Sequence, residues 1–412
     1  MSLAESLTST AVGTLNRGGK ILQQAGVTMP DLRLEALVTA ARRHARLEDF
    51  GQWPIEEPLD RLLNAYEREA NLTPLGRITV RQLLVSLLEN LLYLEQESQA
   101  SPDIERQTID APVFIIGLPR TGTTLLHGLI AQDPATRTPL TWEVMFPAGY
   151  SDTPADIDRI RKRTDSRLAW ANRLAPDFKR IHEIGADLPQ ECIAIMAQGF
   201  ASIQFHTTHN VPSYQDWFET EAQELSYASH YRVLQHLQAK RAGKRWVLKA
   251  PGHLFGLDAL LKRYPDARII QTHRDPLKVM PSIASLVTVL RRAFSDPADP
   301  KQIAADWCGR WSSALDRSLD TRDNRPTECF FDIAYADLTA APLIAVERLY
   351  EFLGWPLSSA ARDSMQRFLS ANPKHKHGAH RYGLADFGLD RVIETRRFAR
   401  YCERFEIPAE SR

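Results

Sequence analysis

A balanced charge and an ordinary composition set the first limits on this chain of 412 residues. Lysine plus arginine and aspartate plus glutamate both total 51, so the formal net charge is zero, which argues against a general nucleic-acid or membrane-surface binder. Hydrophobic residues make up 43% of the chain, which is typical of a globular protein with one large domain or two modest ones.

The cysteines and the N-terminal segment indicate the cellular compartment. Cys192, Cys308, Cys329 and Cys402 are scattered and form no C-x-x-C pair, so we expect reduced thiols rather than disulfides or a zinc site. Residues 1–6 lack a basic segment followed by an apolar core, and no apolar run reaches the length of a membrane span. These patterns predict a cytoplasmic chain without a transmembrane segment.

The first 110 residues are predicted to form a helical N-terminal region. Leu84, Leu87, Leu88 and Leu91 recur at the spacing of one helix face. No cluster of catalytic residue types accompanies them, so we expect these helices to cap the fold or to form a wall of the ligand cavity. Residues 111–412 are predicted to form an α/β domain with a helical insertion at about 150–240.

The most informative stretch lies between residues 113 and 130. The apolar run Val113-Phe-Ile-Ile is typical of a buried parallel strand, a loop from Gly117 to Gly122 follows it, and residues 125–130 have helical periodicity. In this order the backbone N–H groups of the loop and of the helix N-terminus point toward a bound anion. The stretch therefore predicts a phosphate-binding loop; the alternative is a glycine turn that holds no ligand.

The loop departs from the Walker A pattern, G-x-x-x-x-G-K-[ST], in the position of its cation. Gly117, Gly122 and Thr124 fit the pattern, whereas Thr123 stands at the lysine position and Arg120 supplies a positive charge within the loop. This departure argues against an ordinary ATPase or GTPase. The residues that we expect to contact the ligand are Arg120, Thr121, Gly122, Thr123, Thr124 and Leu125.

Three further apolar runs, residues 245–249, 268–272 and 328–331, are predicted to be strands that alternate with helices. Such alternation indicates a P-loop-like parallel sheet flanked by helices, with the helical N-terminal region as an extension. Ligands of these sheets lie at the carboxyl ends of the strands. Arg120, Lys249 and Arg274 all fall at such ends, so we expect them to converge on a multiply charged phosphate ligand.

These residues resemble those of sulfotransferases that use 3′-phosphoadenosine 5′-phosphosulfate (PAPS), over roughly residues 112–390. Residues 117–124 are similar to the 5′-phosphosulfate loop of this family, and Arg274 and Ser282 resemble the pair that holds the 3′-phosphate. The basic segment with Lys376, His377 and Gly378 is loosely similar to its C-terminal 3′-phosphate loop. The resemblance implies PAPS as cofactor, adenosine 3′,5′-bisphosphate as product, no metal, and the hydroxyl of a small molecule or lipid as acceptor.

Two departures indicate the branch of this family. Arg120 stands where many cytosolic sulfotransferases have lysine, and their histidine base has no secure counterpart here. Both features resemble the tyrosylprotein and bacterial small-molecule branch, in which a catalytic lysine has a place similar to Lys249, 25 residues before Arg274. The resemblance implies that Arg120 and Lys249 stabilise the leaving phosphate and the transferred group.

The general base is expected to be a glutamate, as is usual in that branch. Glu143 lies between Trp142 and the apolar Val144, where partial burial raises a carboxyl pKa toward a useful value. Its distance from the phosphate-loop helix is also similar to that of the catalytic glutamate in tyrosylprotein-type relatives. We therefore predict Glu143 as the base, and the other candidates are Glu191, His127, His206 and His209.

Two other functions remain open at this point. A P-loop nucleoside or small-molecule kinase would need a Walker lysine, and Thr123 stands in its place. A non-catalytic nucleotide-binding module would keep the loop without the catalytic groups. The oligomeric state cannot be read from the sequence.

Overall fold

A five-stranded parallel sheet lies at the centre of the structure, a computed structural model that describes residues 29–174, 184–241, 245–295, 299–372 and 383–410. The strand order is β2-β3-β1-β4-β5, and neighbouring strands run parallel. The arrangement confirms the predicted α/β fold class. The strands are β1 (Val113–Ile116), β2 (Thr136–Arg137), β3 (Arg245–Lys249), β4 (Arg268–His273) and β5 (Phe330–Ala334).

The central strand, β1, is buried on both faces of the sheet. Phe114 and Ile116 belong to a large hydrophobic core, whereas Val113 and Ile115 belong to a smaller one, because successive side chains of a strand point to opposite faces. This double burial explains the continuous apolar run in the sequence. Ile115 pairs with Lys249 of β3, so the carboxyl ends of neighbouring strands lie at one edge of the sheet.

Three of the four predicted strands begin where the sequence indicated. β4 extends one residue beyond Thr272, and β5 begins at Phe330, two residues later than predicted, because Thr327–Cys329 forms a 3-10 turn (η4). The strand β2 was not predicted from the sequence. That strand has only two residues and no apolar run, and it is held by its pairing with the start of β3, where Thr136 lies opposite Arg245.

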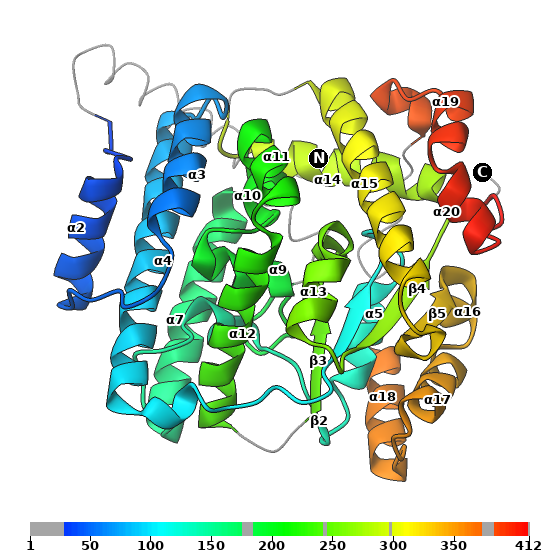
Figure 1. Ribbon diagram of the computed structural model, residues 1–412, viewed down its shortest axis with the longest axis horizontal. Coiled ribbons are helices and arrows are strands. Elements are labelled where there is room, and N and C mark those ends of the chain that lie inside the picture. The colour runs from blue at the N-terminus through cyan, green and yellow to red at the C-terminus, as the bar shows by residue number, and fades with distance from the viewer. Residues whose placement is uncertain (1–28, 175–183, 242–244, 296–298, 373–382, 411–412) are drawn as a thin grey trace.

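Helices cover both faces of this sheet (Figure 1). The smaller core is closed by α5 (Thr123–Ile130), α17 (Pro342–Leu353) and α18 (Ser359–Ala371). The larger core is closed by α12 (Gln223–Lys240), α13 (Leu257–Arg263), α14 (Pro276–Arg292) and α15 (Pro300–Asp323). The C-terminal part adds α16 (Tyr335–Ala340), α19 (Arg391–Arg397) and α20 (Ala399–Arg404), and the short 3-10 segments are η1 (Pro102–Ile104), η2 (Ala197–Gly199), η3 (Pro251–Phe255) and η5 (Leu384–Phe387).

The described part of the N-terminal region is helical and stands at one side of the molecule (Figure 1). Its last helix begins with a cap, because the Thr73 hydroxyl accepts a hydrogen bond from the N–H of Gly76 at 3.0 Å. The N–H of Thr73 in turn donates to the carbonyl of Phe294, just beyond α14, at 3.0 Å. The N-terminal helices are therefore joined to the sheet domain. They are α2 (Leu34–Ala45), α3 (Glu56–Arg68) and α4 (Pro74–Ala100).

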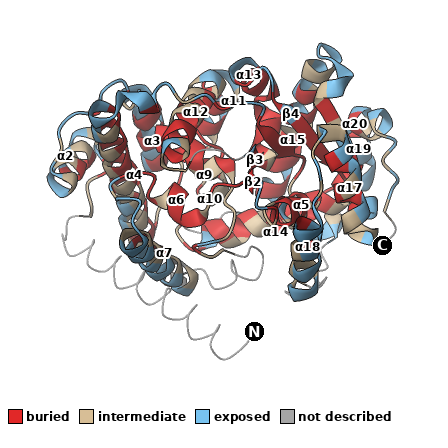
Figure 2. Cartoon of the chain, turned by 90° about the horizontal axis from the view of Figure 1, so that it is seen from below, coloured by how far each residue is buried: buried red, intermediate tan, exposed pale blue. Residues whose placement is uncertain are grey.

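A helical segment separates β2 from β3 and lies between the N-terminal helices and the sheet (Figure 1). Figure 2 shows α9 as mostly buried and α10 as buried or partly buried, whereas α7 presents an exposed face to solvent. The exposed face agrees with the charged composition of α7. The helices of this segment before α12 are α6 (Thr141–Met145), α7 (Pro154–Leu174), α9 (Cys192–Met196), α10 (Gln204–Thr208) and α11 (Pro212–Thr220).

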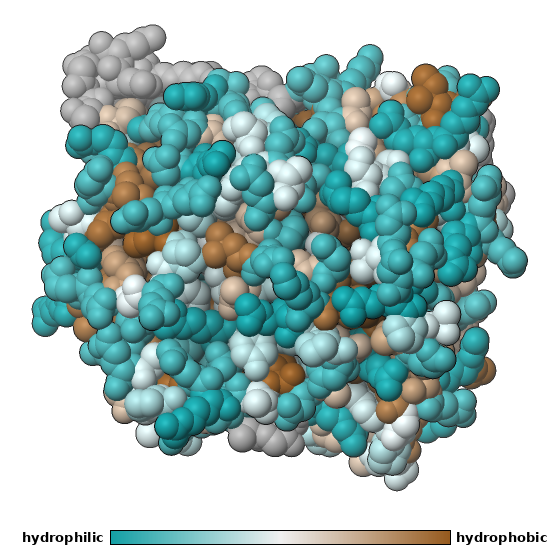
Figure 3. Space-filling model, viewed as in Figure 1, coloured by the Kyte–Doolittle hydropathy of each residue, from teal (hydrophilic) through white to brown (hydrophobic). Residues whose placement is uncertain are grey.

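The face of the molecule in Figure 3 is largely hydrophilic, with apolar side chains in small separate patches. The large apolar residues that are exposed in the described ranges are Ile78, Trp170, Ile344, Val392 and Ile393. Across the described residues, none of the helices combines the length and the apolar character that a membrane crossing requires.

Candidate active site

The loop between β1 and α5 turns sharply at two glycines. Gly117 has a φ of 138° and Gly122 a φ of 90°, backbone conformations that favour glycine. A Cβ atom on Gly117 would lie 2.5 Å from Oγ1 of Thr272, so a larger residue does not fit. Between the glycines, the Thr121 hydroxyl is hydrogen-bonded to the carbonyl of Leu118 and to Oγ1 of Thr272, both at 2.6 Å. These contacts anchor the loop to β4.

The start of α5 offers hydrogen-bond donors next to this loop. The N–H of Leu126 donates to the carbonyl of Gly122 at 3.0 Å, so the N–H groups of Thr123, Thr124 and Leu125 have no acceptor within the helix. Arg120, within the loop, is exposed. Its φ of 67° is uncommon for a residue other than glycine. The loop thus combines unused N–H groups, a helix N-terminus and a cation, as an anion site requires.

A cavity of about 510 Å³ opens over the loop. Its polar lining includes Arg120, Thr123, Thr124, Glu191, Arg274 and Tyr335. Its apolar lining includes Leu125, Ile193, Ile203, Leu286, Trp311 and Leu369. A phosphate-binding loop and a hydrophobic wall therefore border one space.

A buried lysine, which is not among the described residues that line this cavity, contacts two residues that are, Glu191 and Thr124. Lys249, the last residue of β3, has a side chain only 2% exposed. Its ammonium group donates to Oε1 of Glu191 and, at 3.3 Å, to Oγ1 of Thr124. Glu191 precedes α9, but its side chain does not cap that helix and contacts Lys249 instead. The wall of the cavity thus holds a proton acceptor beside a desolvated cation, a pairing suited to acid–base chemistry.

Arg274, directly after β4, lines the same cavity. Its guanidinium lies 4.0 Å from the centre of the Tyr335 ring, and Nη1 donates to the carbonyl of Arg120 at 3.0 Å. Nε and Nη2 donate to the two carboxylate oxygens of Glu410 at 2.8 and 3.1 Å. The structure therefore brings Arg274 to the phosphate loop, as expected from its place just beyond the end of a predicted strand, and adds a carboxylate partner, Glu410, that was not predicted.

The structure gives less information on the other residues predicted to bind the 3′-phosphate. Ser282 is half-buried on α14, one helical turn before Leu286, which lines the cavity. Its assignment remains a prediction. Lys376, His377 and Gly378 lie outside the described residues.

The surroundings of Glu143 differ from the expectation for a base. Its carboxylate is 3% exposed, Oε1 accepts from Nη2 of Arg137 at 3.2 Å, and Oε2 accepts from the N–H of Leu140 at 2.9 Å. These bonds cap the start of α6, and Glu143 is not among the described residues that line the cavity. The expectation that Glu143 faces the acceptor is therefore corrected, because its oxygens are taken up by a buried ion pair and a helix cap.

The three candidate histidines are packed into the interior. Burial lowers the pKa of His127 and of His209 to about 3 and that of His206 to about 4. Nε2 of His127 is hydrogen-bonded to the carbonyl of Val247 at 3.2 Å. None of the three is among the described residues that line the cavity. Glu191 is thus the one of the five candidates that reaches the cavity in the described part of the chain.

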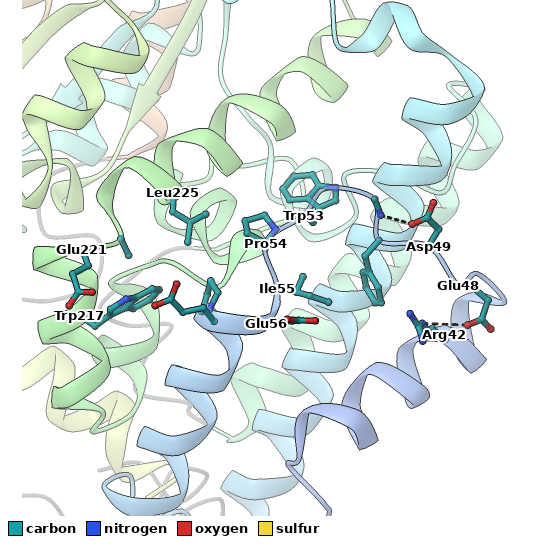
Figure 4. Close-up of a pocket in the computed structure, with 15 residues that line it drawn as sticks. Arg42, Glu48, Asp49, Trp53, Pro54, Ile55, Glu56, Trp217, Glu221 and Leu225 are labelled. Atoms are coloured by element: carbon teal, nitrogen blue, oxygen red, sulfur yellow. Dashed lines mark hydrogen bonds and ion pairs between the residues drawn. The ribbon is translucent and has the colours of Figure 1, made fainter.

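A second cavity, of about 740 Å³, lies beside the N-terminal helices (Figure 4). Glu48, Asp49, Glu56 and Glu221 stand around it, with Trp53, Pro54 and Trp217 between them. None of the predicted site residues lines it, and its carboxylates would repel a phosphate ligand. We therefore place the functional site in the smaller cavity, where the phosphate loop and the cations converge.

A parallel α/β sheet with a phosphate loop after its central strand defines a class of nucleotide-dependent group-transfer enzymes. Within this class, a family model described as "Sulfotransferase family" matches residues 112–359, more than half of the chain. The chain belongs to the sulfotransferase family and is therefore an enzyme. Family membership confirms the resemblance inferred from the sequence and sets the kinase alternative aside.

Mycobacterial sulfotransferases are similar to the chain in structure and sequence. The crystal structure of STF1 from Mycobacterium tuberculosis H37Rv has a TM-score of 0.79 and 33% identity, over 89% of this chain and 98% of STF1. That of STF9 from Mycobacterium avium has a TM-score of 0.81 and 26% identity, over 93% of this chain and all of STF9. In sequence, the omega-hydroxy-beta-dihydromenaquinone-9 sulfotransferase Stf3 of Mycobacterium bovis is 26% identical over 287 residues, 66% of this chain and 70% of Stf3.

Proposed function

We propose that this sulfotransferase takes its sulfuryl group from PAPS and transfers it to the hydroxyl of an apolar small molecule or lipid. One observation carries the proposal: the buried Lys249 contacts both Glu191 and Thr124, which line the same cavity as Arg120 and Arg274. This arrangement puts a base, a buried cation and a phosphate loop around one space. Sulfuryl transfer, like phosphoryl transfer, depends on such positioning and on electrostatic stabilisation.

The residues present fit the charges of PAPS. The N–H groups of Thr123, Thr124 and Leu125, together with Arg120, suit the oxygens of a 5′-phosphosulfate. Arg274, with its planar fork of donors, suits a 3′-phosphate. When bound, PAPS supplies an activated sulfuryl group whose leaving group is a phosphate.

The chain's own residues then handle the acceptor proton and the developing charge. Glu191 accepts the proton of the acceptor hydroxyl at a carboxylate oxygen. Lys249 orients that carboxylate through its bond to Oε1 and brings a positive charge close to Thr124 and the phosphate loop. Because the Lys249 side chain is almost fully buried, its charge is weakly screened by water, which strengthens its effect on a nearby anion.

The apolar wall of the cavity supports an apolar acceptor. Ile193, Ile203, Leu286 and Trp311 line the cavity that also holds the phosphate loop, so an apolar group beside the reacting hydroxyl would be removed from water. The name of the relative Stf3 states a menaquinone-derived lipid alcohol as its substrate. We propose an acceptor of this chemical class, an alcohol on a largely hydrocarbon or quinone-like body.

We also propose that the chain works in the cytoplasm. Its four cysteines, Cys192, Cys308, Cys329 and Cys402, are present as free thiols. Unpaired thiols, two of them buried, suit a reducing compartment.

Ligand-induced stabilisation tests the choice of donor. The protein is heated with adenosine 3′,5′-bisphosphate, PAPS, AMP, ATP or GTP, each with and without magnesium. We expect the bisphosphate to raise the melting temperature without magnesium, and to raise it by much more than AMP does. A ligand that binds only the folded state stabilises that state by RT ln(1 + [L]/Kd), so the tighter ligand gives the larger shift. Stabilisation by ATP that requires magnesium and exceeds that by the bisphosphate would contradict the proposal.

A further inference from the structure

The guanidinium of Arg274 is already engaged by a carboxylate of the same chain. Nε and Nη2 donate in parallel to the two oxygens of Glu410, at 2.8 and 3.1 Å. Paired bonds of this kind are also how arginine binds a phosphate group. Glu410 thus occupies the side of Arg274 that a phosphate would use in the same two-pronged way.

The segment that carries Glu410 is held at a second point. The N–H of Glu410 donates to Oδ2 of Asp275 at 3.0 Å, and Oδ1 of Asp275 accepts from the N–H of Leu277 at the start of α14. Asp275 is buried, whereas Glu410 has a side chain 33% exposed. In the structure without a nucleotide, this backbone contact holds the segment beside the cavity, and the partly exposed carboxylate is accessible to water.

Arg274 itself is held by other contacts when Glu410 departs. Nη1 donates to the carbonyl of Arg120, and the guanidinium lies over the ring of Tyr335. These contacts come from the phosphate loop and from Tyr335 at the start of α16, both outside the segment that carries Glu410. The arginine is therefore positioned without Glu410, and the carboxylate is an occupant of the site rather than its support.

We propose that Glu410 is an internal competitor for Arg274, which a nucleotide must displace with its 3′-phosphate. The proposal rests on the function proposed above, in which Arg274 binds that phosphate. A phosphate dianion displaces the single charge of a carboxylate, whereas a nucleotide without a 3′-phosphate leaves Glu410 in place. Glu410 thereby weakens the binding of 3′-phosphorylated nucleotides and not of AMP, and its segment is released when a 3′-phosphorylated nucleotide binds.

Competition of this kind lowers the apparent affinity by the fraction of molecules in which the site is open. The ion pair between Arg274 and Glu410 is only partly buried, with side chains 21% and 33% exposed. We therefore expect it to raise the apparent Kd of the bisphosphate only moderately. We expect Glu410→Gln to lower the Kd of adenosine 3′,5′-bisphosphate by about 3- to 10-fold. The Kd of AMP should stay within about twofold, because AMP does not need this side of Arg274.

The measurement is calorimetric titration of both nucleotides into the full-length protein, Glu410→Gln and a control, Glu403→Gln. Glu403 is an exposed residue of α20, so its replacement removes the same charge nearby without touching Arg274. The control should bind both nucleotides like the original protein. A Kd for the bisphosphate that is unchanged or raised in Glu410→Gln would overturn the proposal, because Glu410 would then be idle or would hold Arg274 in position.

Hydrogen exchange adds an independent readout. The N–H of Glu410 donates to Asp275, so its exchange should become faster when the bisphosphate displaces the segment and should not change with AMP. Slower or unchanged exchange with the bisphosphate would overturn the proposal.

Arg274→Ala separates this inference from the proposed function. If the bisphosphate bound Arg274→Ala as tightly as the original protein, Arg274 would not be the 3′-phosphate site and the underlying assignment would fail. If Arg274→Ala weakened the bisphosphate selectively while Glu410→Gln did not strengthen it, only the competition would fail.

Discussion

Glu143 and Glu191, both candidates for the general base, have different partners in the structure. Glu143, between apolar neighbours, is used to cap α6 and to pair with Arg137, whereas Glu191, at the start of α9, leaves that helix uncapped and contacts Lys249. The surroundings of each carboxylate are set by the cation that it contacts. Arg137 lies six residues before Glu143, while Lys249 lies 58 residues after Glu191, on a different element of the fold.

Replacement of each glutamate by glutamine should separate catalysis from stability. We expect Glu191→Gln to lower turnover by about 10²–10⁴-fold, because the proton acceptor is lost, while bisphosphate affinity changes little, because Arg274 and the phosphate loop are retained. Glu143→Gln should keep most of the activity but lower the free energy of unfolding by about 1–3 kcal/mol, because it leaves the buried Arg137 without its charged partner. Steady-state kinetics and urea denaturation on both variants measure the two effects.

The opposite result would reassign the base. If Glu143→Gln abolished turnover in a protein as stable as the original, and Glu191→Gln remained active, the carboxylate at Glu191 would serve only to hold Lys249.

At the scale of elements, the features that could be predicted are those whose signal lies in residues adjacent in the sequence. The strands β1, β3 and β4 and the phosphate loop were found because an apolar run or a glycine spacing is a local signal. β2 carries no such signal, since its pairing with β3 defines it. Glu410 gave none either, because its partner Arg274 is 136 residues away in the chain. β2 and the contact of Glu410 with Arg274 could not be predicted from the sequence, because each is defined by residues that are distant in the chain.

The contact between α4 and the end of α14 gives a prediction at this scale. A Cβ atom on Gly76 would lie 1.9 Å from the carbonyl oxygen of Phe294, so Gly76→Ala must push the two helices apart. We expect a loss of about 1–3 kcal/mol or more in the free energy of unfolding. Gly309→Ala is the matched control: its Cβ would meet only Nη1 of Arg397, at 3.6 Å, and we expect a gain of about 0.4–1 kcal/mol.

Urea denaturation of the two variants measures whether the free energy of unfolding falls in Gly76→Ala and rises in Gly309→Ala. Equal effects of Gly76→Ala and Gly309→Ala would mean that the N-terminal helices are not fastened to the sheet domain at this point.

For the whole molecule, the large core is continuous from the N-terminal helices to α20, and it holds histidines in the neutral state. Burial lowers the pKa of His206 to about 4 and the pKa values of His127, His209 and His230 to about 3. Their ordinary value in an unfolded chain is about 6.5. The unfolded state therefore binds protons more readily than the folded state in the window between these values.

This difference predicts a loss of stability in mild acid. Above pH 6.5 neither state protonates these rings, so their contribution is fully present. As the pH falls from 6.5 toward 4, each ring lowers the free energy of unfolding by about 1.4 kcal/mol per pH unit, until the folded state also takes up the proton. Urea denaturation at constant ionic strength from pH 7.5 to 4.5 should show this decline, and a flat profile down to pH 5 would contradict it.

A single variant shows whether the histidines cause the decline. His209→Gln should make the profile less steep than that of the original protein, because one buried titrating group is removed.

The left-handed backbone at Arg120 has a consequence for laboratory evolution. A residue with a side chain is strained in this conformation, and glycine relieves the strain. Selection for heat resistance alone would therefore favour glycine at position 120 and discard the cation that the phosphate loop carries in place of the Walker lysine. Because Arg120 is proposed to stabilise the leaving phosphate, we expect thermostable variants with glycine at position 120 to be folded but to have lower turnover, so turnover has to be part of the selection from its first round.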